Sequence, residues 1–472
     1  MNMKRMMDMY RNMNVTIDNR KDTEKLQMNK IDKEQKIERK EMIDMMEMNT
    51  QDYGAMILPD GKFYSLNDRE TRLNNNVLIV GTTGAAKTRT VITPNLLECV
   101  GSYVVTDPKG NLYRQWGDYM RQQGYRVVRL SFIHPEKSVH YNPLKYVKTT
   151  QQIQQLASML VRSSRGRTAD PYWDDMSLML INSLISYVKE TTKETDKQHS
   201  FHGIVDILRM AGRHGTSSRT TQLSVMMEKL YAKNKRSWGY KQFQNVNQAP
   251  DKTFNTIVST SIAKFCSVDT EELEQMMQDD EIDFPSIGKQ KTAVFVEVSD
   301  SDRSMDMLIN MFFTQAMNQL CTYADEECEN SQLPVPVRFF MDDFATNCKI
   351  DNFENMISNI RSRKISVMLV LQSLSQLEKG YDKGANTIID NCDTLLYMGG
   401  NDVETAKSIA IRCNKTVQTI LRMPLCTSWI FRRGQKPFSC RNFELNDYLV
   451  AKQIIPISNV TPWWKSGVEL VS

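Results

Sequence analysis

The sequence predicts an α/β fold in which a mostly parallel sheet is interrupted by a long, wholly helical insertion. Three observations support this prediction. Strands and helices alternate between residues 76 and 130, as they do in a parallel α/β sheet. Apolar residues then recur at helical spacing from about 150 to 285. Four further apolar strands follow between residues 293 and 398.

The first part of the sheet begins with the apolar strand 76–80, which leads into a glycine-bearing turn and a helix ending near Cys99. Two more strands are predicted at 103–106 and 125–130, on either side of a helical segment. In the insertion, Ile153, Leu156 and Leu160 share one helical face, and no strongly alternating strand occurs there.

The second part of the sheet contains four strands, and three of them have chemically distinctive ends. The strand at 337–341 ends at Asp342-Asp343, and the strand at 365–371 ends at Gln372. The strand at 394–398 ends at Gly399-Gly400. In an open α/β sheet the carboxyl ends of the strands line the ligand crevice, so we expect a binding site there.

Composition excludes several classes of protein. The chain has 472 residues, enough for two or three domains, and its 40% hydrophobic and 25% charged residues are typical of a globular protein. The nine cysteines are scattered and form no C-x-x-C pair, which argues against a disulfide framework and a zinc site. The net charge of +4 neither requires nor excludes a nucleic-acid partner.

Membrane segments are not predicted. No run of about 18 apolar residues occurs, and the N-terminus is too polar for a signal peptide. We therefore expect a cytoplasmic protein with no intrinsic transmembrane segment, brought to the inner face of the cell membrane only by partners.

A phosphate-binding loop is predicted directly after the first strand. Its sequence is nearly G-x-x-x-x-G-K-[ST], the Walker A motif, whose backbone N–H groups face phosphate oxygens. Lys87 would reach the terminal phosphates of ATP, and the Thr88 hydroxyl would ligate Mg²⁺. The alternative is a chance strand, turn and helix with a capping Lys-Thr pair. The predicted nucleotide-binding residues are Gly81, Thr82, Thr83, Gly84, Ala85, Ala86, Lys87 and Thr88.

One position departs from the loop pattern. Ala86 stands where the motif has its last glycine. A Cβ in a left-handed conformation costs about 1–2 kcal/mol, so this residue puts the geometry of the loop and the rate of hydrolysis in question.

Asp342 and Asp343 form the acidic partner of the loop, in the manner of a Walker B motif. Asp342 would hold Mg²⁺ through water, and Asp343 would orient or deprotonate the attacking water. Related ATPases usually carry glutamate at the second position, so the shorter aspartate is a second reason to question the rate. Without the phosphate loop, the Asp342-Asp343 pair would be explained more simply as a solvated turn after a strand. Lys87 and Asp342 are 255 positions apart, so the chain between them must include a separate module.

Two further positions are candidates for catalysis. Gln372 can sense the γ-phosphate or polarise the attacking water, and a plain helix cap is the alternative. Arg361 and Arg363 precede the same strand, where an arginine can reach a neighbouring subunit's γ-phosphate in a ring. A pair of surface arginines explains that pattern equally well.

The ordered motifs resemble a known family, the type IV coupling proteins of conjugation and type IV secretion. The resemblance extends from about residue 52 to 445. It is carried by the blocks GTTGAAKTRTVITPNLL, GSYVVTDPKGNLY, PYWDDMSLMLI, KTFNTIVSTSIAKF, FFMDDFAT, IRSRKISVMLVLQSLSQL and NCDTLLYMGGNDVETA.

The resemblance implies a RecA-like P-loop motor domain with an inserted all-α domain, a hexameric ring and ATP-driven movement of DNA. It implies that Lys87 and Thr88 bind ATP and Mg²⁺, that Asp342 and Asp343 act on metal and water, that Gln372 is a sensor and that Arg361 is the arginine finger. Asp107 is a weaker candidate near the phosphates. Most members carry an N-terminal membrane anchor, and none is evident here.

We expect five segments on these grounds. Residues 1–50 form a polar arm, either helical or disordered, and 449–472 form a C-terminal tail. The motor domain comprises 51–149 and 286–448, and the all-α domain comprises 150–285.

Sequence-independent DNA contacts are predicted where basic and aromatic residues interleave, because such surfaces neutralise the backbone and stack bases. The candidates in the insertion are Lys233, Lys235, Arg236, Trp238 and Lys241. Arg162, Arg165 and Arg167 form a second basic cluster, and a solvated loop is the simpler explanation of both. Trp463-Trp464 suits a packing anchor better than a stacking platform.

Three functions remain open at this point. The first is ATP-driven DNA translocation that couples a relaxase–DNA substrate, with its relaxosome proteins, to a type IV secretion channel. The second is a nucleotide-binding scaffold that recruits substrate with little or no hydrolysis. The third is a DNA translocase or helicase unrelated to secretion.

Overall fold

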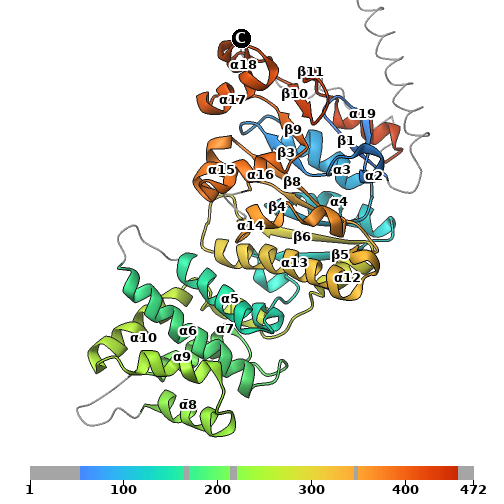
Figure 1. Cartoon of the computed structure of the whole chain (residues 1–472). Helices are drawn as coiled ribbons and strands as arrows, with labels where there is room; N and C mark the ends of the chain where they lie inside the picture. Colours follow the sequence, from blue (N-terminus) through green and yellow to red (C-terminus); the bar gives the residue numbers. More distant parts are fainter. Residues whose placement is uncertain (1–53, 164–169, 213–220, 345–348, 455–472) are drawn as a thin grey trace, which may run out of the picture. The chain divides into compact units, whose positions relative to one another are not determined.

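A mostly parallel sheet forms the core of the compact unit that comprises residues 72–441 (Figure 1). The structure is a computed structural model that describes residues 54–163, 170–212, 221–344 and 349–454. Within these residues the sheet has nine strands in the order β11-β10-β9-β3-β8-β7-β4-β6-β5. The strands are β3 (Val77–Val80), β4 (Ser102–Pro108), β5 (Arg126–Ser131), β6 (Thr292–Val298), β7 (Val337–Met341), β8 (Ile365–Leu371), β9 (Thr394–Tyr397), β10 (Thr427–Arg432) and β11 (Phe438–Arg441).

The pairing from β9 through to β5 is parallel, and only β10 and β11 run antiparallel to their neighbours. Every residue of β6, β7 and β8 is buried, because helices cover both faces of a parallel sheet. Phe339 of β7, for example, packs near Phe313 of α13 (Asp306–Glu327), with ring centroids 6.5 Å apart. The predicted strands are therefore confirmed, and the antiparallel hairpin β10–β11 adds to them.

Strand order brings the chemically distinctive strand ends together. β8 lies between β3 and β7, with Val80 level with Leu371 and Met341 level with Leu369. The parallel strands β3, β7, β8 and β9 all end at the same edge of the sheet, so the residues that follow them are neighbours in space.

The insertion between β5 and β6 contains only helices among its described residues. Helix α6 (Pro171–Thr191) is central: Leu180, Leu184 and Val188 are fully buried. It begins at Asp170, whose side chain accepts a hydrogen bond from the N–H of Tyr172. The other helices are α5 (Thr150–Ser163), α7 (Phe201–Arg209), α8 (Gln222–Lys233), α9 (Trp238–Asn247), α10 (Asp251–Phe265), α11 (Glu271–Met277) and α12 (Phe284–Lys289).

A buried ion pair crosses this helical segment. Lys264 Nζ of α10 lies 2.9 Å from Asp174 Oδ1 of α6, and the two side chains are 8% and 4% exposed. Buried charges need such partners, because burial deprives each of them of water.

Asp280 joins the two connections between the helical segment and the sheet. Its carboxylate accepts hydrogen bonds from the N–H of Asn142 at 3.0 Å and from the hydroxyl of Tyr146 at 2.5 Å, and it pairs with Lys145 Nζ at 3.5 Å. Burial raises the pKa of Asp280 to about 6. The chain leaving β5 is thereby tied to the chain entering β6.

A second compact unit consists of residues 54–71 and 442–454. It contains the antiparallel pair β1 (Ala55–Ile57) and β2 (Phe63–Ser65), with α2 (Asp68–Thr71) and α19 (Leu445–Ala451). The N–H of Phe443 donates to the carbonyl oxygen of Pro59 at 2.9 Å. The domain boundaries at 50, 149, 285 and 448 stay a prediction, and the predicted arm and tail fall largely outside the described residues. No helix in the described ranges is both long enough and apolar enough to cross a bilayer.

Candidate nucleotide-binding site

The loop after β3 is fastened to the two strands that flank it. The N–H of Gly81 donates to the carbonyl oxygen of Leu371 at 3.0 Å, and the N–H of Thr82 donates to that of Gly399 at 3.0 Å. Gly81 has little room for a side chain, since a Cβ there would lie 3.0 Å from the Cβ of Met398. Thr82, Thr83 and Gly84 project into solvent.

The backbone of the loop has the left-handed conformation that the sequence pattern requires. Gly84 has φ +85° and Ala86 has φ +59°. The expectation that Ala86 occupies a left-handed position is therefore confirmed. The N–H groups of Gly84 and Ala86 form no hydrogen bond with the described part of the chain, so both can bind an anion.

A helix begins immediately after the loop. It opens with a π-helical turn (Thr88–Ile92) and continues as α3 (Thr93–Leu97). The N–H of Thr93 donates to the carbonyl oxygen of Thr88, five residues earlier, which is the spacing of a π-helical turn. The next residue, Pro94, has no N–H and cannot donate to the preceding turn. Such turns are often found at functional sites.

Lys87 lies against the loop. Its ammonium donates to the carbonyl oxygens of Gly81, at 2.6 Å, and Thr82, at 3.0 Å. Burial lowers the pKa of Lys87, while the carboxylates of Asp342 and Asp343 act in the opposite direction. The cation and both acidic side chains thus belong to one electrostatic cluster.

Thr88 meets Asp342 across 254 positions of sequence. The Thr88 hydroxyl donates to Asp342 Oδ2 at 2.8 Å. Burial raises the pKa of Asp342, and the hydrogen bond from Thr88 partly offsets this shift. One hydroxyl and one carboxylate are hard oxygen ligands that fit Mg²⁺, which commonly takes its remaining ligands from water and phosphates.

Asp343 and Gln372 complete the cluster. Gln372 Nε2 donates to Asp343 Oδ1 at 3.2 Å, and the N–H of Asp343 donates to Asp342 Oδ1 at 3.1 Å. Asp343 has φ +50°, a conformation in which aspartate is better tolerated than most residues. The backbone N–H of Gln372 is bound by Gln376 Oε1 at 3.0 Å, which leaves the Gln372 side chain to face the carboxylate.

Comparison with known proteins shows the family to which the chain belongs. The family model described as type IV secretory system conjugative DNA transfer matches residues 21–422. The chain belongs to this family. The resemblance to type IV coupling proteins is thereby confirmed. The predicted RecA-like α/β fold class is confirmed by the sheet described above together with the solved structures described below.

Two curated relatives illustrate how distant the similarity is. Protein VirD4 of Rhizobium radiobacter is 22% identical over 349 residues, which are 71% of this chain and 47% of that protein. The conjugal transfer protein TraG of Escherichia coli is 21% identical over 402 residues, which are 78% of this chain and 59% of that protein. The chain spans about half the length of the curated relatives it matches.

Solved structures of the plasmid coupling protein TrwB share the fold. The complex of TrwB with a non-hydrolysable ATP analogue has a TM-score of 0.61 and 14% identity, covering 85% of this chain and 92% of TrwB. The complex of TrwB with ADP and Mg²⁺ has a TM-score of 0.57 and 15% identity over the same shares.

Arg361 lies apart from the other predicted catalytic residues of this family member. It belongs to a short 3₁₀ turn (Ile360–Arg363) that precedes β8, whereas Gln372 follows β8. Arg361 is therefore at the amino edge of the sheet and the phosphate loop is at the carboxyl edge. Arg363 forms a two-pronged ion pair with Asp325, at 2.9 and 2.7 Å.

The Asp107 carboxylate has partners in the helix that follows β4. Its carboxylate accepts hydrogen bonds from the N–H groups of Leu112 at 2.9 Å and Tyr113 at 2.8 Å, and so caps helix α4 (Asn111–Gln122). Burial raises the pKa of Asp107 to about 6.

The candidate DNA-binding residues of the insertion fall into two groups. The aromatic residue Trp238 begins α9 and packs against the core, and Tyr240 is buried and stacked on Tyr231. The exposed cations are Lys233, Lys235, Arg236 and Lys241. Arg162 is exposed at the end of α5. Arg165, Arg167 and the Trp463-Trp464 pair lie outside the described residues.

Two supports of the site are not indicated by any local sequence pattern. The Thr106 hydroxyl of β4 accepts a hydrogen bond from the N–H of Asp342. The carbonyl of Gly399 holds Thr82. Thr106 and Gly399 both lie near the carboxyl end of a strand, which is visible in the sequence. Their closeness to the site follows only from the order of the strands in the sheet.

Proposed function

We propose that the chain is an ATP-driven DNA motor that couples a relaxase–DNA substrate to a type IV secretion channel. The contact of Thr88 with Asp342 carries this proposal, because it joins the phosphate loop to the acidic strand in a family of conjugative DNA-transfer proteins. The partners would be DNA, bound without regard to its sequence, together with relaxosome proteins and channel components at the inner face of the membrane.

The residues suggest how hydrolysis would proceed. The loop N–H groups and Lys87 would hold the phosphates of ATP, and Thr88 and Asp342 would hold Mg²⁺. Mg²⁺ would neutralise charge that develops on the phosphates. Asp343, positioned by Gln372, would accept a hydrogen bond or a proton from the attacking water.

Oligomerisation is part of the proposal. Arg361 cannot reach the loop of its own chain, because the length of β8 separates it from Gln372. In a homo-hexamer the amino edge of one subunit would have to approach the nucleotide of the next, and Arg361 would then act as the arginine finger. The segment 150–285 would act as a separate module that contacts DNA through its exposed cations.

Steady-state ATP hydrolysis with and without single-stranded DNA tests the motor. DNA-stimulated turnover that is lost in Lys87→Ala is expected. Asp343→Asn should retain nucleotide binding and lose hydrolysis by roughly 100-fold or more, because it removes only the group that acts on water.

A nucleotide-binding scaffold is the second candidate, and the φ of +59° at Ala86 favours it, since a strained loop can slow hydrolysis. Nucleotide binding without turnover would support the scaffold. So would DNA transfer that survives Asp343→Asn but not Lys87→Ala.

A further inference from the structure

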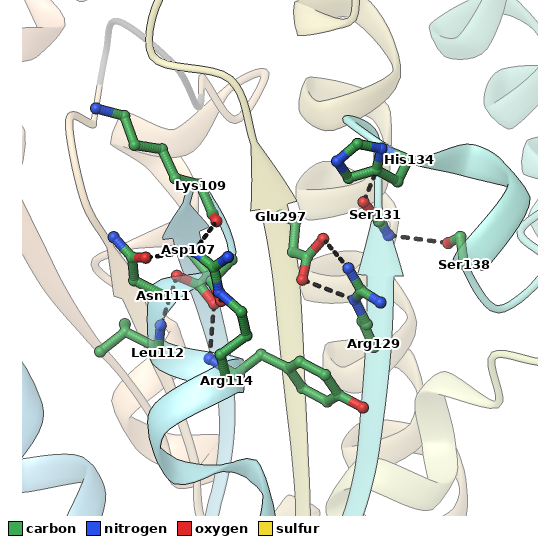
Figure 2. Close-up of polar contacts among 12 residues, drawn as sticks. Asp107, Lys109, Asn111, Leu112, Arg114, Arg129, Ser131, His134, Ser138 and Glu297 are labelled. Carbon is green, nitrogen blue, oxygen red and sulfur yellow. Dashed lines mark hydrogen bonds and ion pairs between the residues drawn. The ribbon is translucent and has the colours of Figure 1, made fainter.

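A pocket lies at the same carboxyl edge of the sheet, among the ends of β4, β6 and β5. Figure 2 shows the polar contacts of several of its residues. We call it the β4–β6–β5 pocket. It has a volume of about 450 Å³. It contains part of the Asp107-Pro-Lys-Gly110 motif, which the nucleotide site does not use. Its lining residues are Lys109, Gly110, Arg114, Arg129, Ile133, His134, Lys137, Glu297, Ser299 and Asp300.

The charge of the pocket is positive. Four of its side chains are Lys or Arg and two are carboxylates, which leaves an excess of two positive charges with His134 neutral. Glu297 is only 2% exposed and both its oxygens are bound by Arg129, at 2.7 and 2.9 Å. Asp300 pairs with Lys109 at 2.7 Å. The remaining cations, Arg114 and Lys137, have no carboxylate partner in the described part of the chain.

Two arginines are held in place with donors left over. The Nε and Nη2 atoms of Arg129 are bound to Glu297, and its guanidinium lies 5.2 Å from the centre of the Tyr113 ring. Arg114 donates through Nε to the carbonyl oxygen of Gly110 and through Nη2 to that of Lys109. The Nη1 atom of each has no acceptor among the described residues. A fixed guanidinium with an unused donor loses little entropy when it binds an oxyanion.

The loops that carry these cations are also fixed. The side chain of Ser131 accepts from the N–H of His134 at 2.9 Å, and Ser138 Oγ accepts from the N–H of Ser131 at 2.9 Å. Gly110 has φ +67°, and a Cβ there would lie 2.5 Å from a Glu297 oxygen. The turn after β4 and the loop after β5 are therefore built around the Glu297–Arg129 pair.

We propose that the β4–β6–β5 pocket binds a phosphate group, separately from the phosphate loop. Arginine forks and lysine ammonium groups suit phosphate oxygens, and the pocket has room for a phosphate with part of an attached sugar. The proposed function supplies one source, the backbone of a single DNA strand. A free phosphate or nucleotide is the other source of the same chemistry.

Binding measurements in a Lys87→Ala background test this, because that change weakens the competing phosphate site. The probes are a fluorescein-labelled 20-mer of thymidylate, followed by anisotropy at several salt concentrations, and inorganic phosphate, followed by ³¹P line width. The variant is R114Q/K137Q. The control is K407Q/K415Q, which removes the same charge from exposed residues that follow β9, near the other end of the sheet.

We expect R114Q/K137Q to bind the DNA strand about tenfold more weakly at 0.1 M salt. The slope of log affinity against log salt should fall by roughly 0.7 for each phosphate that the variant no longer neutralises. Line broadening of inorganic phosphate should fall in parallel. Asp300→Asn provides a test that misfolding cannot mimic, because removing this carboxylate should strengthen binding about threefold.

The outcomes separate the possible sources. Weaker binding of both the DNA strand and inorganic phosphate by R114Q/K137Q supports DNA as the source of the phosphate group. Loss of inorganic phosphate binding alone supports the pocket with a free phosphate as its ligand, and leaves the proposed DNA motor to the ATPase experiment. Equal effects of R114Q/K137Q and K407Q/K415Q, or unchanged binding of both probes, would overturn the proposal.

Discussion

The Gln372 side chain donates a hydrogen bond to Asp343 Oδ1 at 3.2 Å, although the two residues end different strands, β8 and β7. The contact fixes the carboxylate that would act on water. Gln372→Ala is expected to lower kcat roughly 10- to 100-fold with little change in the KM for ATP, because it disturbs positioning and not phosphate binding. Gln376→Ala removes only the bond to the backbone N–H of Gln372 and keeps the amide that faces Asp343, so it should lower kcat less than Gln372→Ala. Equal kcat values for wild type and Gln372→Ala would contradict the assignment.

Ala86→Gly should relieve strain in the phosphate loop. A left-handed alanine costs about 1–2 kcal/mol, and glycine gives back part of that through the entropy of the unfolded chain. We expect a net gain of up to about 1 kcal/mol in the free energy of unfolding, measured by denaturant titration. Ala85→Gly should show no gain, because the positive φ angles of the loop belong to Gly84 and Ala86. A gain of the same size in both variants would show that the strain is not local to Ala86.

Binding of Mg²⁺ should depend on pH through Asp342. Burial raises the pKa of Asp342 above its ordinary 3.8, so the folded protein without metal holds this proton more tightly than the unfolded chain does. The resulting contribution to stability is fully present below pH 3.8 and is lost as pH rises through the raised pKa. Mg²⁺ needs the ionised form, so the stabilisation it provides should grow as pH rises through that same pKa.

The measurement is the shift in Tm on adding Mg²⁺ at constant ADP, followed as pH rises above the ordinary carboxyl pKa of 3.8. The pKa of Asp107 is also raised by burial, to about 6. Its effect cancels because each pair of samples differs only in metal. A metal-dependent shift that does not vary with pH would contradict the assignment of Asp342 as a metal ligand.

The Lys264–Asp174 pair should be essential to the stability of the helical segment. Lys264→Met leaves the Asp174 carboxylate buried without its cation, and we expect a loss of about 3–5 kcal/mol in the free energy of unfolding. The double variant K264M/D174L should recover most of this loss. Lys407→Met breaks the exposed pair with Glu404 and should cost less than about 1 kcal/mol. Guanidinium denaturation distinguishes these outcomes.

Much of the fold could be predicted from local pattern. The strands of the parallel sheet are apolar runs that end in polar residues or glycine, and burial on both faces makes such runs conspicuous. The hairpin β10–β11 was missed, because β10 alternates with Ser428 and Arg432 on its buried side and so hides the apolar signal. Ala86 could be assigned a left-handed conformation because its position within the motif fixes its backbone.

The finer features of the site depend on contacts between distant segments. The bond from Asp342 to Thr106 spans 236 positions, and no local pattern indicates it. Asp343 adopts φ +50°, which accounts for an aspartate where glutamate was expected, since aspartate tolerates a left-handed backbone better. The role of Asp107 was equally hidden, because a strand-end carboxylate can face either a ligand or the helix that follows it.

The tie at Asp280 has a mechanical consequence. One connection of the helical segment follows β5, the other precedes β6, and the Asp280 carboxylate joins the two. A force on those helices would therefore act through this contact on β5 and β6 together. That point of application lies near the amino ends of β5 and β6, where Arg126 donates to the carbonyl oxygen of Glu281, and it is separated from β3 by the three strands β4, β7 and β8. Under the proposed function, a movement caused by nucleotide hydrolysis beside β3 would therefore have to pass through the buried parallel strands β8, β7 and β4 before it reached the helices.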